Sequence, residues 1–270
     1  MKQDVDLERF KKQVLVPGIG VSGLEKLADT TVLFCGLGGG GSVGAHQFVL
    51  SNVGRVVLCD HDKVEYSNLG RQYLYDEASI GTYKVLAAEK FLRKTNPNVD
   101  VVPIHQKVDL NLLETVYKKY KNLLIYVAID KWNCHFLINE FCIKNEIPAV
   151  HMGSIGFKGF VYVYNPQKTQ TCFECSMRQG YIGNIDVTEI DKADTVYPYL
   201  PPVISTAGSI AVTEGIKLIL NKEKSLVNSF LMYRGTDHAD VFENAISGAP
   251  IFDQVTTQKN NQCELCKKCI

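Results

Sequence analysis

The chain has 270 residues and a mass of 30.1 kDa, a length that predicts one large domain or one domain with an insertion. Its 29 basic and 29 acidic side chains cancel to a formal net charge of zero without a long basic block, which argues against a dedicated nucleic-acid or membrane-surface binder. A hydrophobic content of 46% with 21% charged residues is typical of globular proteins and excludes disordered and collagen-like chains.

No apolar run in the sequence reaches the roughly 18 to 20 residues that cross a bilayer. The longest, from Leu123 to Ile129, has the size of a strand. The stretch MKQDVDLERFKKQ at the start is charged throughout and lacks the apolar core of a signal peptide. We therefore expect a soluble, cytoplasmic protein, in which the nine cysteines are better interpreted as metal ligands than as disulfides.

Strand-like and helix-like patterns alternate from residue 31 to about residue 153. The predicted strands are Thr31–Cys35, Val56–Cys59, Val99–Ile104, Leu123–Ala128 and Ala149–Met152. The predicted helices are Ser42–Leu50, Lys84–Lys94, Leu110–Lys121 and Trp132–Asn145. Because parallel strands need crossover helices, this alternation predicts an α/β fold with a Rossmann-like, mostly parallel sheet and helices on both of its faces.

The pattern changes after Gly153. Gly159–Tyr164 alternates like an antiparallel strand, Ile204–Leu220 has the length of a helix, and Leu226–Tyr233 indicates another strand. We therefore expect antiparallel strands to extend the parallel sheet. Gly180–Pro202 indicates a long surface segment, and a segment of that length inside a compact domain is usually functional or disordered.

A glycine-rich turn lies between the first predicted strand and the helix that follows it. The run Gly36–Gly41 matches G-x-G-x-x-G, in which glycines allow a tight turn and a close approach of backbone to phosphate. The start of the helix offers unpaired N–H groups to an anion. Asp60 ends the next strand, where a carboxylate can accept hydrogen bonds from a ribose. These features predict a nucleotide site and leave NAD and ATP open.

Charged side chains elsewhere favour ATP over NAD. A triphosphate needs cationic side chains and a metal ion, whereas a dinucleotide is held mainly by backbone groups. Arg71 can fork onto phosphate oxygens, Lys84 supplies a point charge, and Asp130 follows a strand at the sheet edge where ligands bind. Together with the run Asp60–Gln72, they predict a site for ATP and Mg²⁺.

At these residues the chain resembles the ThiF/MoeB/HesA family, the bacterial relatives of ubiquitin-activating enzymes. The resemblance extends from Arg9 to Cys266 and includes the glycine run, the motif D-x-D-x-V-x-x-S-N-L-x-R-Q over Asp60–Gln72, and two CxxC pairs. It implies an ATP-dependent adenylyltransferase, a nucleotidyltransferase that activates the C-terminal carboxylate of a ubiquitin-like sulfur-carrier protein or a short peptide. It also implies a homodimer.

The resemblance assigns roles to individual residues. It implies that Arg71, Lys84, Asp130 and Lys12 are catalytic and that Asp130 holds Mg²⁺. The nucleotide-binding residues that it implies are Gly36, Gly38, Gly39, Gly41, Asp60, Asp62, Asn68, Arg71, Gln72 and Lys84. Since a carboxylate is already ionised at pH 7, the reaction needs positioning and positive charge more than acid–base chemistry.

Two CxxC pairs, Cys172 with Cys175 and Cys263 with Cys266, supply four thiolates for a tetrahedral Zn²⁺ site. Their wide separation predicts that the metal fastens the C-terminal region to the segment after the sheet. A redox CxxC is the alternative interpretation, and Cys269 is a further candidate ligand. The resemblance favours Cys263 and Cys266, the pair that corresponds to the family's own.

Two departures from the family pattern bear on activity. Lys12 stands where many relatives have an arginine that reaches ATP across a dimer; lysine keeps the charge but loses the two-pronged geometry. From Ser176 to Gln262 there is no cysteine, although some members form a thioester through a cysteine there. We therefore expect adenylation without an enzyme thioester. His151, at a predicted strand end, is a weaker candidate for substrate contact.

The sequence is thus interpreted as one adenylation domain over residues 1–270. Residues 1–30 form an N-terminal helical arm, 31–153 the nucleotide-binding half, and 154–270 the half that binds substrate and zinc. In this half, Gly180–Pro202 resembles the family's crossover loop over the substrate tail. One alternative is an NAD-dependent oxidoreductase, which leaves Arg71, Lys84 and Asp130 without a role. The other is a catalytically weak recognition subunit, against which the retained ATP-binding set argues.

Overall fold

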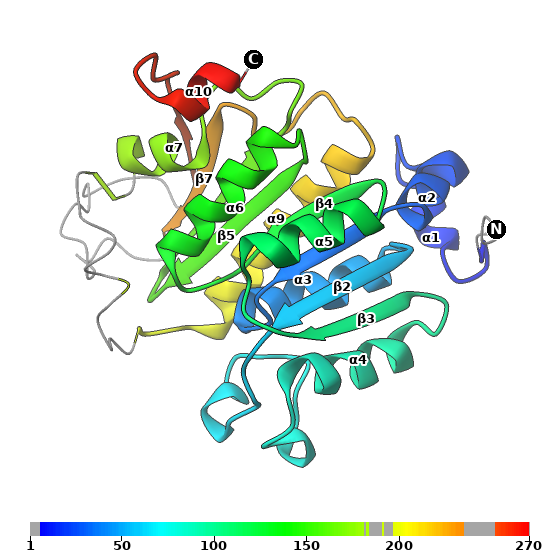
Figure 1. Ribbon diagram of the computed structural model, residues 1–270. Helices are drawn as coiled ribbons and strands as arrows, with labels where there is room; N and C mark the ends of the chain where they lie inside the picture. Colours follow the sequence, from blue (N-terminus) through cyan, green and yellow to red (C-terminus); the bar gives the residue numbers. More distant parts are fainter. Residues whose placement is uncertain (1–5, 181, 184–190, 192–196, 235–251, 270) are drawn as a thin grey trace.

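A computed structural model describes residues 6–180, 182–183, 191, 197–234 and 252–269. The described strands form one sheet of eight in the order β3-β2-β1-β4-β5-β6-β7-β8 (Figure 1). The strands are β1 Thr31–Cys35, β2 Arg55–Asp60, β3 Asp100–His105, β4 Leu123–Val127, β5 Ala149–Ile155, β6 Lys158–Tyr164, β7 Ser229–Arg234 and β8 Phe252–Thr256.

The described α-helices are α1 Lys11–Val14, α2 Gly20–Ala28, α3 Gly39–Leu50, α4 Lys84–Thr95, α5 Leu110–Lys119, α6 Trp132–Lys144, α7 Phe173–Gly180, α9 Pro201–Ile219 and α10 Glu264–Lys268. Two short 3-10 helices, η1 Tyr66–Asn68 and η2 Glu77–Ser79, lie between β2 and α4. Within the described ranges, no helix combines the length and the apolarity that a bilayer crossing requires.

Strands β1 to β5 form the parallel half of the sheet. β1 lies at its centre, paired in parallel with β2 on one side and with β4 on the other. The chain moves outward from β1 to β3, then returns across the sheet to β4, so the strand order reverses beside β1. In open parallel sheets, ligands bind beyond the carboxyl ends of the strands at such a reversal. This topology therefore places a crevice after β1 and β4.

Strands β6, β7 and β8 continue the sheet in antiparallel pairing from β5. The sequence predicted the antiparallel β6 and β7 but not β8, whose residues alternate between exposed and half-buried positions. Its sequence, FDQVT, has only two apolar residues, too weak a pattern to indicate a strand without its partner. The short helices α7 and α10 were missed for the same reason, since each gives too few residues to establish a period.

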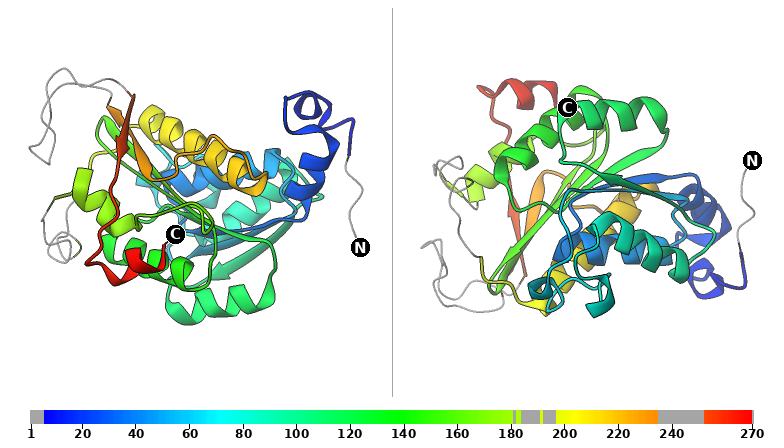
Figure 2. Two further views of the ribbon diagram at one scale, coloured as in Figure 1. Left: turned by 90° about the horizontal axis from the view of Figure 1, so that it is seen from above. Right: turned by 60° about the horizontal axis from the view of Figure 1, so that its bottom comes forward.

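Helices cover both faces of the sheet, as Figure 2 shows. On one face, Val32 and Phe34 of β1 belong to a core that includes residues of α3, α4 and α9. Their neighbours Leu33 and Cys35 belong to the opposite core, which includes residues of α5, α6 and α7. Because successive side chains of a strand point to opposite faces, a strand covered on both sides is predominantly apolar, as β1 is from Val32 to Cys35. The predicted α/β class is confirmed.

The core beneath α3 gives a first test of this packing. Phe48 is fully buried, with its ring centroid 5.9 Å from that of Phe34 and 6.0 Å from that of Tyr126. We expect Phe48→Ala to lower the free energy of unfolding by about 3–5 kcal/mol, because it leaves a cavity where three aromatic rings meet. Leu50→Ala, on the exposed end of the same helix, should change it by less than about 0.5 kcal/mol. Urea unfolding measures both, and equal effects would contradict the packing.

Candidate active site

The turn after β1 can be built only with glycine at two positions. Gly36 has φ +91°, and a Cβ there would lie 2.4 Å from the carbonyl oxygen of Ala128. A Cβ on Gly41 would lie 2.0 Å from the carbonyl oxygen of Gly36. Around Gly38, by contrast, a Cβ would meet no atom within 4 Å. The turn is therefore tight on its protein side and open on the other, where the first N–H groups of α3 point outward.

Asp60, at the end of β2, fastens the glycine turn to the next strand. Its Oδ2 accepts a hydrogen bond of 2.7 Å from the Leu37 N–H, and its Oδ1 accepts one of 2.8 Å from the Asp62 N–H. The carboxylate is 8% exposed, so it remains accessible from one side. Because an ionised carboxylate has about four acceptor sites, Asp60 can still accept hydrogen bonds from hydroxyl groups of a ligand.

Lys84 lies between two carboxylates. It is only 6% exposed, and its Nζ donates a 2.8 Å hydrogen bond to Asp62 Oδ2. Partial burial raises the pKa of Asp62, but the hydrogen bond and charge of Lys84 outweigh it, with the net result that this pKa is lowered. Desolvation by the surrounding protein dominates at Asp130 and raises its pKa, although Lys84, Arg71 and Tyr199 oppose the rise. A buried lysine thus holds the Asp62 carboxylate ionised near a second carboxyl group, Asp130, whose pKa is raised.

Arg71 reaches the same space from the loop after η1. Its Nη1 donates a 2.9 Å hydrogen bond to the Ser67 carbonyl, and its guanidinium carbon lies 5.1 Å from the centre of the Tyr199 ring. Asn68, the last residue of η1, and Gln72, in the loop after it, are buried. The Gln72 Oε1 has no hydrogen-bond partner among the described residues, although it borders a cavity. A buried amide oxygen of this kind suits a ligand that donates a hydrogen bond.

These groups line one cavity of about 720 Å³ at the carboxyl ends of the parallel strands. A cavity of this size accommodates a ligand as large as a nucleotide. The sequence-predicted residues that line it are Gly36, Gly38, Gly39, Asp60, Asp62, Asn68, Arg71, Gln72, Lys84 and Asp130. Gly41 is not among its described lining residues and lies behind the turn, against Gly36.

Lys12 is the predicted residue that the fold places elsewhere. It is exposed on α1. The N-terminal arm lies near the amino ends of the parallel strands (Figure 1), whereas the cavity lies at their carboxyl ends. Gln13, next to it, donates a 2.8 Å hydrogen bond to the Leu50 carbonyl and holds the arm against the end of α3. Within one chain, therefore, Lys12 cannot reach the cavity that contains Arg71 and Lys84.

The proposed crossover segment, Gly180–Pro202, lies largely outside the described residues, which include from it only 180, 182–183, 191 and 197–202. Asp191 accepts hydrogen bonds of 2.9 Å from the N–H groups of Trp132 and Asn133, at the start of α6. Tyr197 and Tyr199 line the cavity. The sequence did not single out these tyrosines, and the run YPYLPP before a helix was the available signal.

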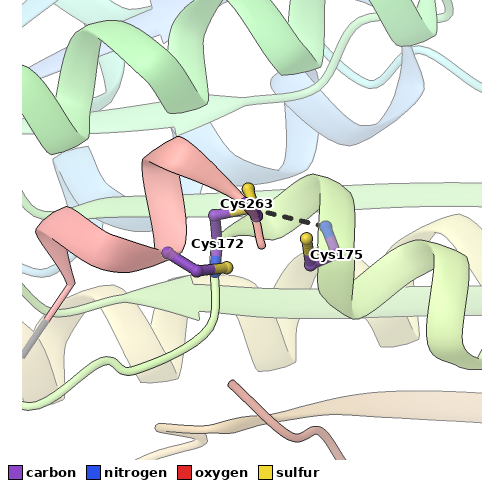
Figure 3. A group of neighbouring side chains, drawn as sticks. Cys172, Cys175 and Cys263 are labelled. Atoms are coloured by element: carbon purple, nitrogen blue, oxygen red, sulfur yellow. Dashed lines mark hydrogen bonds between the residues drawn. The ribbon is translucent and has the colours of Figure 1, made fainter. Parts of the chain in front are cut away.

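The four cysteines of the two CxxC pairs meet at the start of α7 and α10. Their sulfur atoms all lie within 4.8 Å of one another. The sulfurs of Cys172 and Cys263 are 3.9 Å apart, and Figure 3 shows these two side chains beside Cys175. The hydrogen bond between the two thiols lowers the pKa of Cys175 and raises that of Cys172, so Cys175 is the first of the pair to ionise. Cys269 is buried outside this group, with its sulfur 3.5 Å from the Leu265 carbonyl. All nine cysteines lie in the described ranges and are free, which excludes disulfides among them.

Comparison with known proteins agrees with this geometry. The sequence matches the ThiF family over residues 10–250. The chain belongs to the ThiF family.

Two curated relatives are similar along nearly their whole length. The molybdopterin-synthase adenylyltransferase of Salmonella typhimurium is 26% identical over 97% of both chains. The sulfur carrier protein adenylyltransferase of Thermus thermophilus is 29% identical over 97% of this chain and 91% of its own. A crystal structure of E. coli MccB with MccA-N7isoASN shares the fold, with a TM-score of 0.78 and 20% identity, over 98% of this chain and 76% of that one. The predicted family and fold are thus confirmed.

A pair of buried histidines, His135 and His151, lies beside the cavity of this ThiF-family chain, and His135 lines it. The Nδ1 atoms of His135 and His151 are 3.0 Å apart, and His135 Nε2 is 3.0 Å from the Ile129 carbonyl. Since a carbonyl only accepts, the network assigns the proton of His135 to Nε2 and leaves its Nδ1 to accept from His151. His151 is fully buried and does not line the described cavity, so it is unsuited to the substrate contact suggested for it.

Burial of this pair predicts a loss of stability in acid. It lowers the pKa of His135 to about 4 and that of His151 well below its usual value. The unfolded chain takes up these protons below a pKa of about 6.5, whereas the folded chain does not. Above that pH the pair contributes no pH dependence. We expect the free energy of unfolding to fall as the pH drops from about 6.5 to about 4, by roughly 3 kcal/mol from His135 alone.

Urea unfolding across this pH range tests the effect. His151→Leu should reduce the decline, because the variant no longer buries the second imidazole. His61→Gln, at a side chain that is 49% exposed, should leave the decline unchanged and serves as the control. A decline of the same size in all three proteins would show that other groups cause it.

Proposed function

We propose that this chain is an ATP-dependent adenylyltransferase that activates the C-terminal carboxylate of a ubiquitin-like sulfur-carrier protein, or of a short peptide, as an acyl-adenylate. The observation that carries the proposal is the cavity itself. It combines a glycine turn and the start of α3 with Arg71, Lys84 and Asp130 at one sheet edge. A dinucleotide needs only the first of these, whereas a triphosphate uses them all.

The residues that line the cavity bind different parts of the ligand, according to their chemistry. The N–H groups at the start of α3 and the side chains of Arg71 and Lys84 bind phosphate oxygens. Asp60 and the unpartnered Gln72 Oε1 accept hydrogen bonds from the ribose or base. Asp130 and Asp62 offer hard oxygen ligands that fit Mg²⁺, which when bound neutralises charge on the phosphates. These groups fit the nucleotide and the cation together.

The reaction follows from this arrangement. The ionised carboxylate of the substrate attacks the α-phosphorus, the bond to the bridging oxygen breaks, and pyrophosphate leaves with the electron pair. Two anions repel one another, so Arg71 and Lys84 accelerate the step by offsetting that repulsion and fixing the geometry. No side chain has to remove a proton, since the nucleophile is already ionised at pH 7.

The relatives' names support the class of substrate. One is named for molybdopterin synthase and another for a sulfur carrier protein, and both are named adenylyltransferases. The free thiols support transfer without an enzyme thioester. Cys35, Cys59 and Cys142 are buried in the core, and burial raises the pKa of each. Cys134 borders the cavity, but burial raises its pKa as well, and a thiol is a weaker nucleophile than a thiolate.

Lys12 supports a homodimeric assembly within the proposal. Since it lies across the sheet from its own cavity, it can act on ATP only by reaching the cavity of a second copy. A protein that consumes ATP and has nine cysteines without a disulfide among them is suited to a reducing compartment, and we place its activity in the cytoplasm. An NAD-dependent oxidoreductase is disfavoured because it gives Lys84 and Asp130 no role. A catalytically weak recognition subunit is disfavoured because most of the ATP-binding residues meet in one cavity.

Nucleotide binding tests the central proposal without knowledge of the partner. Mg-ATP at about 100 times its Kd should stabilise the protein by about 2.7 kcal/mol and raise its Tm by roughly 5–10 °C, whereas NAD should not. Lys84→Met should abolish most of this rise because it removes the buried cation. Lys90→Met, at an exposed position of the same helix, is the matched control. A rise with NAD and none with Mg-ATP would overturn the proposal in favour of a dehydrogenase.

We further propose that the four clustered cysteines bind a structural Zn²⁺. In a tetrahedral site with Zn–S bonds of about 2.3 Å, the sulfurs lie about 3.8 Å apart. The distance of 3.9 Å between the sulfurs of Cys172 and Cys263 fits that spacing. The Cys172 N–H lies 3.3 Å from the Cys266 sulfur, a contact that stabilises a thiolate ligand.

Zinc analysis of the purified protein tests this site. We expect one zinc ion per chain, and Cys263→Ser should lose it and lower the Tm, because the metal joins α10 to α7. Cys269→Ser should retain the zinc, since that sulfur lies outside the group. Wild-type protein without zinc, or zinc lost only from the Cys269 variant, would contradict this assignment.

A further inference from the structure

Tyr199 joins two cavity residues of opposite charge. Its hydroxyl lies within reach of the Asp130 carboxylate, and this contact opposes the rise in the pKa of Asp130 and adds to the rise in the pKa of Tyr199. Its ring faces the guanidinium of Arg71, with the carbon of that group 5.1 Å from the ring centre. One side chain therefore contacts both the proposed cation ligand and the proposed phosphate-binding cation, and it borders the cavity itself.

The backbone fixes where this tyrosine stands. Leu200 is extended, at φ −113° and ψ 120°, as a residue before proline must be, and α9 begins at Pro201. The Pro198 carbonyl accepts a 2.8 Å hydrogen bond from the Gly156 N–H, and Tyr199 forms a bridge with Gly156. The segment is thus held at one end by the turn between β5 and β6 and at the other by a long helix.

That helix is in turn positioned by the glycine turn. A Cβ on Gly39 would lie 3.0 Å from the side chain of Ile204, so the first turn of α9 packs directly on the start of α3. Tyr73 adds a contact of 2.6 Å between its hydroxyl and that of Ser205. Tyr199 therefore keeps a defined place relative to the phosphate-binding turn, through packing rather than through the ligand.

Tyr199 contacts both Asp130 and Arg71 and can thereby keep these two side chains from pairing with each other. In a partly buried cavity, a free guanidinium and a free carboxylate attract one another strongly and would pair directly. The Tyr199 ring holds Arg71 from its face, while the Ser67 carbonyl holds its Nη1 at 2.9 Å. The hydroxyl occupies one acceptor site of Asp130 and leaves the others available to a cation.

We propose that Tyr199 is a positioning residue of the nucleotide site, which keeps Asp130 and Arg71 apart and oriented so that one receives Mg²⁺ and the other receives phosphate. This inference rests on the proposed function. It assigns two separable roles to one side chain, since the hydroxyl serves Asp130 and the ring serves Arg71.

Two variants separate these roles by calorimetric titration with ATP at several Mg²⁺ concentrations. Tyr199→Phe keeps the ring and loses the hydroxyl, so the Mg²⁺ concentration needed for half-maximal affinity should rise about tenfold. Its Kd for ATP at saturating Mg²⁺ should stay within about twofold of wild type. Tyr199→Leu loses the ring as well, and its Kd at saturating Mg²⁺ should rise about fivefold.

Two controls separate positioning from general stability. Tyr117→Phe, on α5 and outside the described cavity lining, should match wild type in both measurements. In an Asp130→Asn background, Tyr199→Phe should cause no further change, because its effect passes through that carboxylate. A Tm without ligand close to that of wild type should accompany the Tyr199→Phe result, which a purely structural role would not give.

The outcomes distinguish this inference from the function on which it rests. If wild-type protein binds Mg-ATP and Tyr199→Phe has the same Mg²⁺ dependence, the positioning role is wrong and the proposed function stands. The positioning role is also wrong if Tyr199→Phe weakens binding equally in the Asp130→Asn background. If wild-type protein does not bind Mg-ATP, both are overturned.

Discussion

The contact between the turn after β1 and the first turn of α3 constrains the rest of this structure. A Cβ on Gly41 would lie 2.0 Å from the Gly36 carbonyl, and one on Gly36 would lie 2.4 Å from that of Ala128. Only glycines therefore let α3 begin directly beside the ends of β1 and β4. That approach directs unpaired N–H groups into the crevice where the strand order reverses. The cationic side chains then gather around a place that backbone geometry has already defined.

The same constraint positions the second half of the chain, because α9 packs along α3 through small residues. A Cβ on Gly208 would lie 2.9 Å from Val43, and one on Gly215 would lie 2.7 Å from Phe48. The Gln47 side chain donates a 2.8 Å hydrogen bond to Ser209 across the two helices. Close packing of this kind allows little sliding, so the start of α9 is fixed relative to the glycine turn. A residue just before α9 can for that reason serve the nucleotide site from far along the sequence.

Sequence patterns predicted the parallel half well, since β1 and β4 are predominantly apolar and the helices between strands are long enough to show a period. The glycine turn and Asp130 were predictable for a related reason. Each directly follows a parallel strand, and the carboxyl ends of parallel strands meet at the same edge of the sheet. β8 was not, because its stability comes from pairing with β7 rather than from its own residues. Tyr199 escaped prediction because its partners are brought to it by tertiary packing. The position of Lys12, at the end of the sheet opposite the cavity, also depends on the whole fold and could not be predicted from local sequence.

The cysteine group and the cavity are connected by a short run of buried contacts. The Phe173 N–H, next to Cys172, donates a 3.0 Å hydrogen bond to Asn139 of α6. The Phe173 ring stacks on His151 with centroids 4.3 Å apart, and the His135 partner of His151 holds the Ile129 carbonyl. Ile129 immediately precedes Asp130. Because each contact is buried and directional, ordering the cysteines around a metal restrains the backbone that carries Asp130 without any ligand contact. A metal bound by the four cysteines would therefore restrain the backbone at Asp130 without touching the cavity.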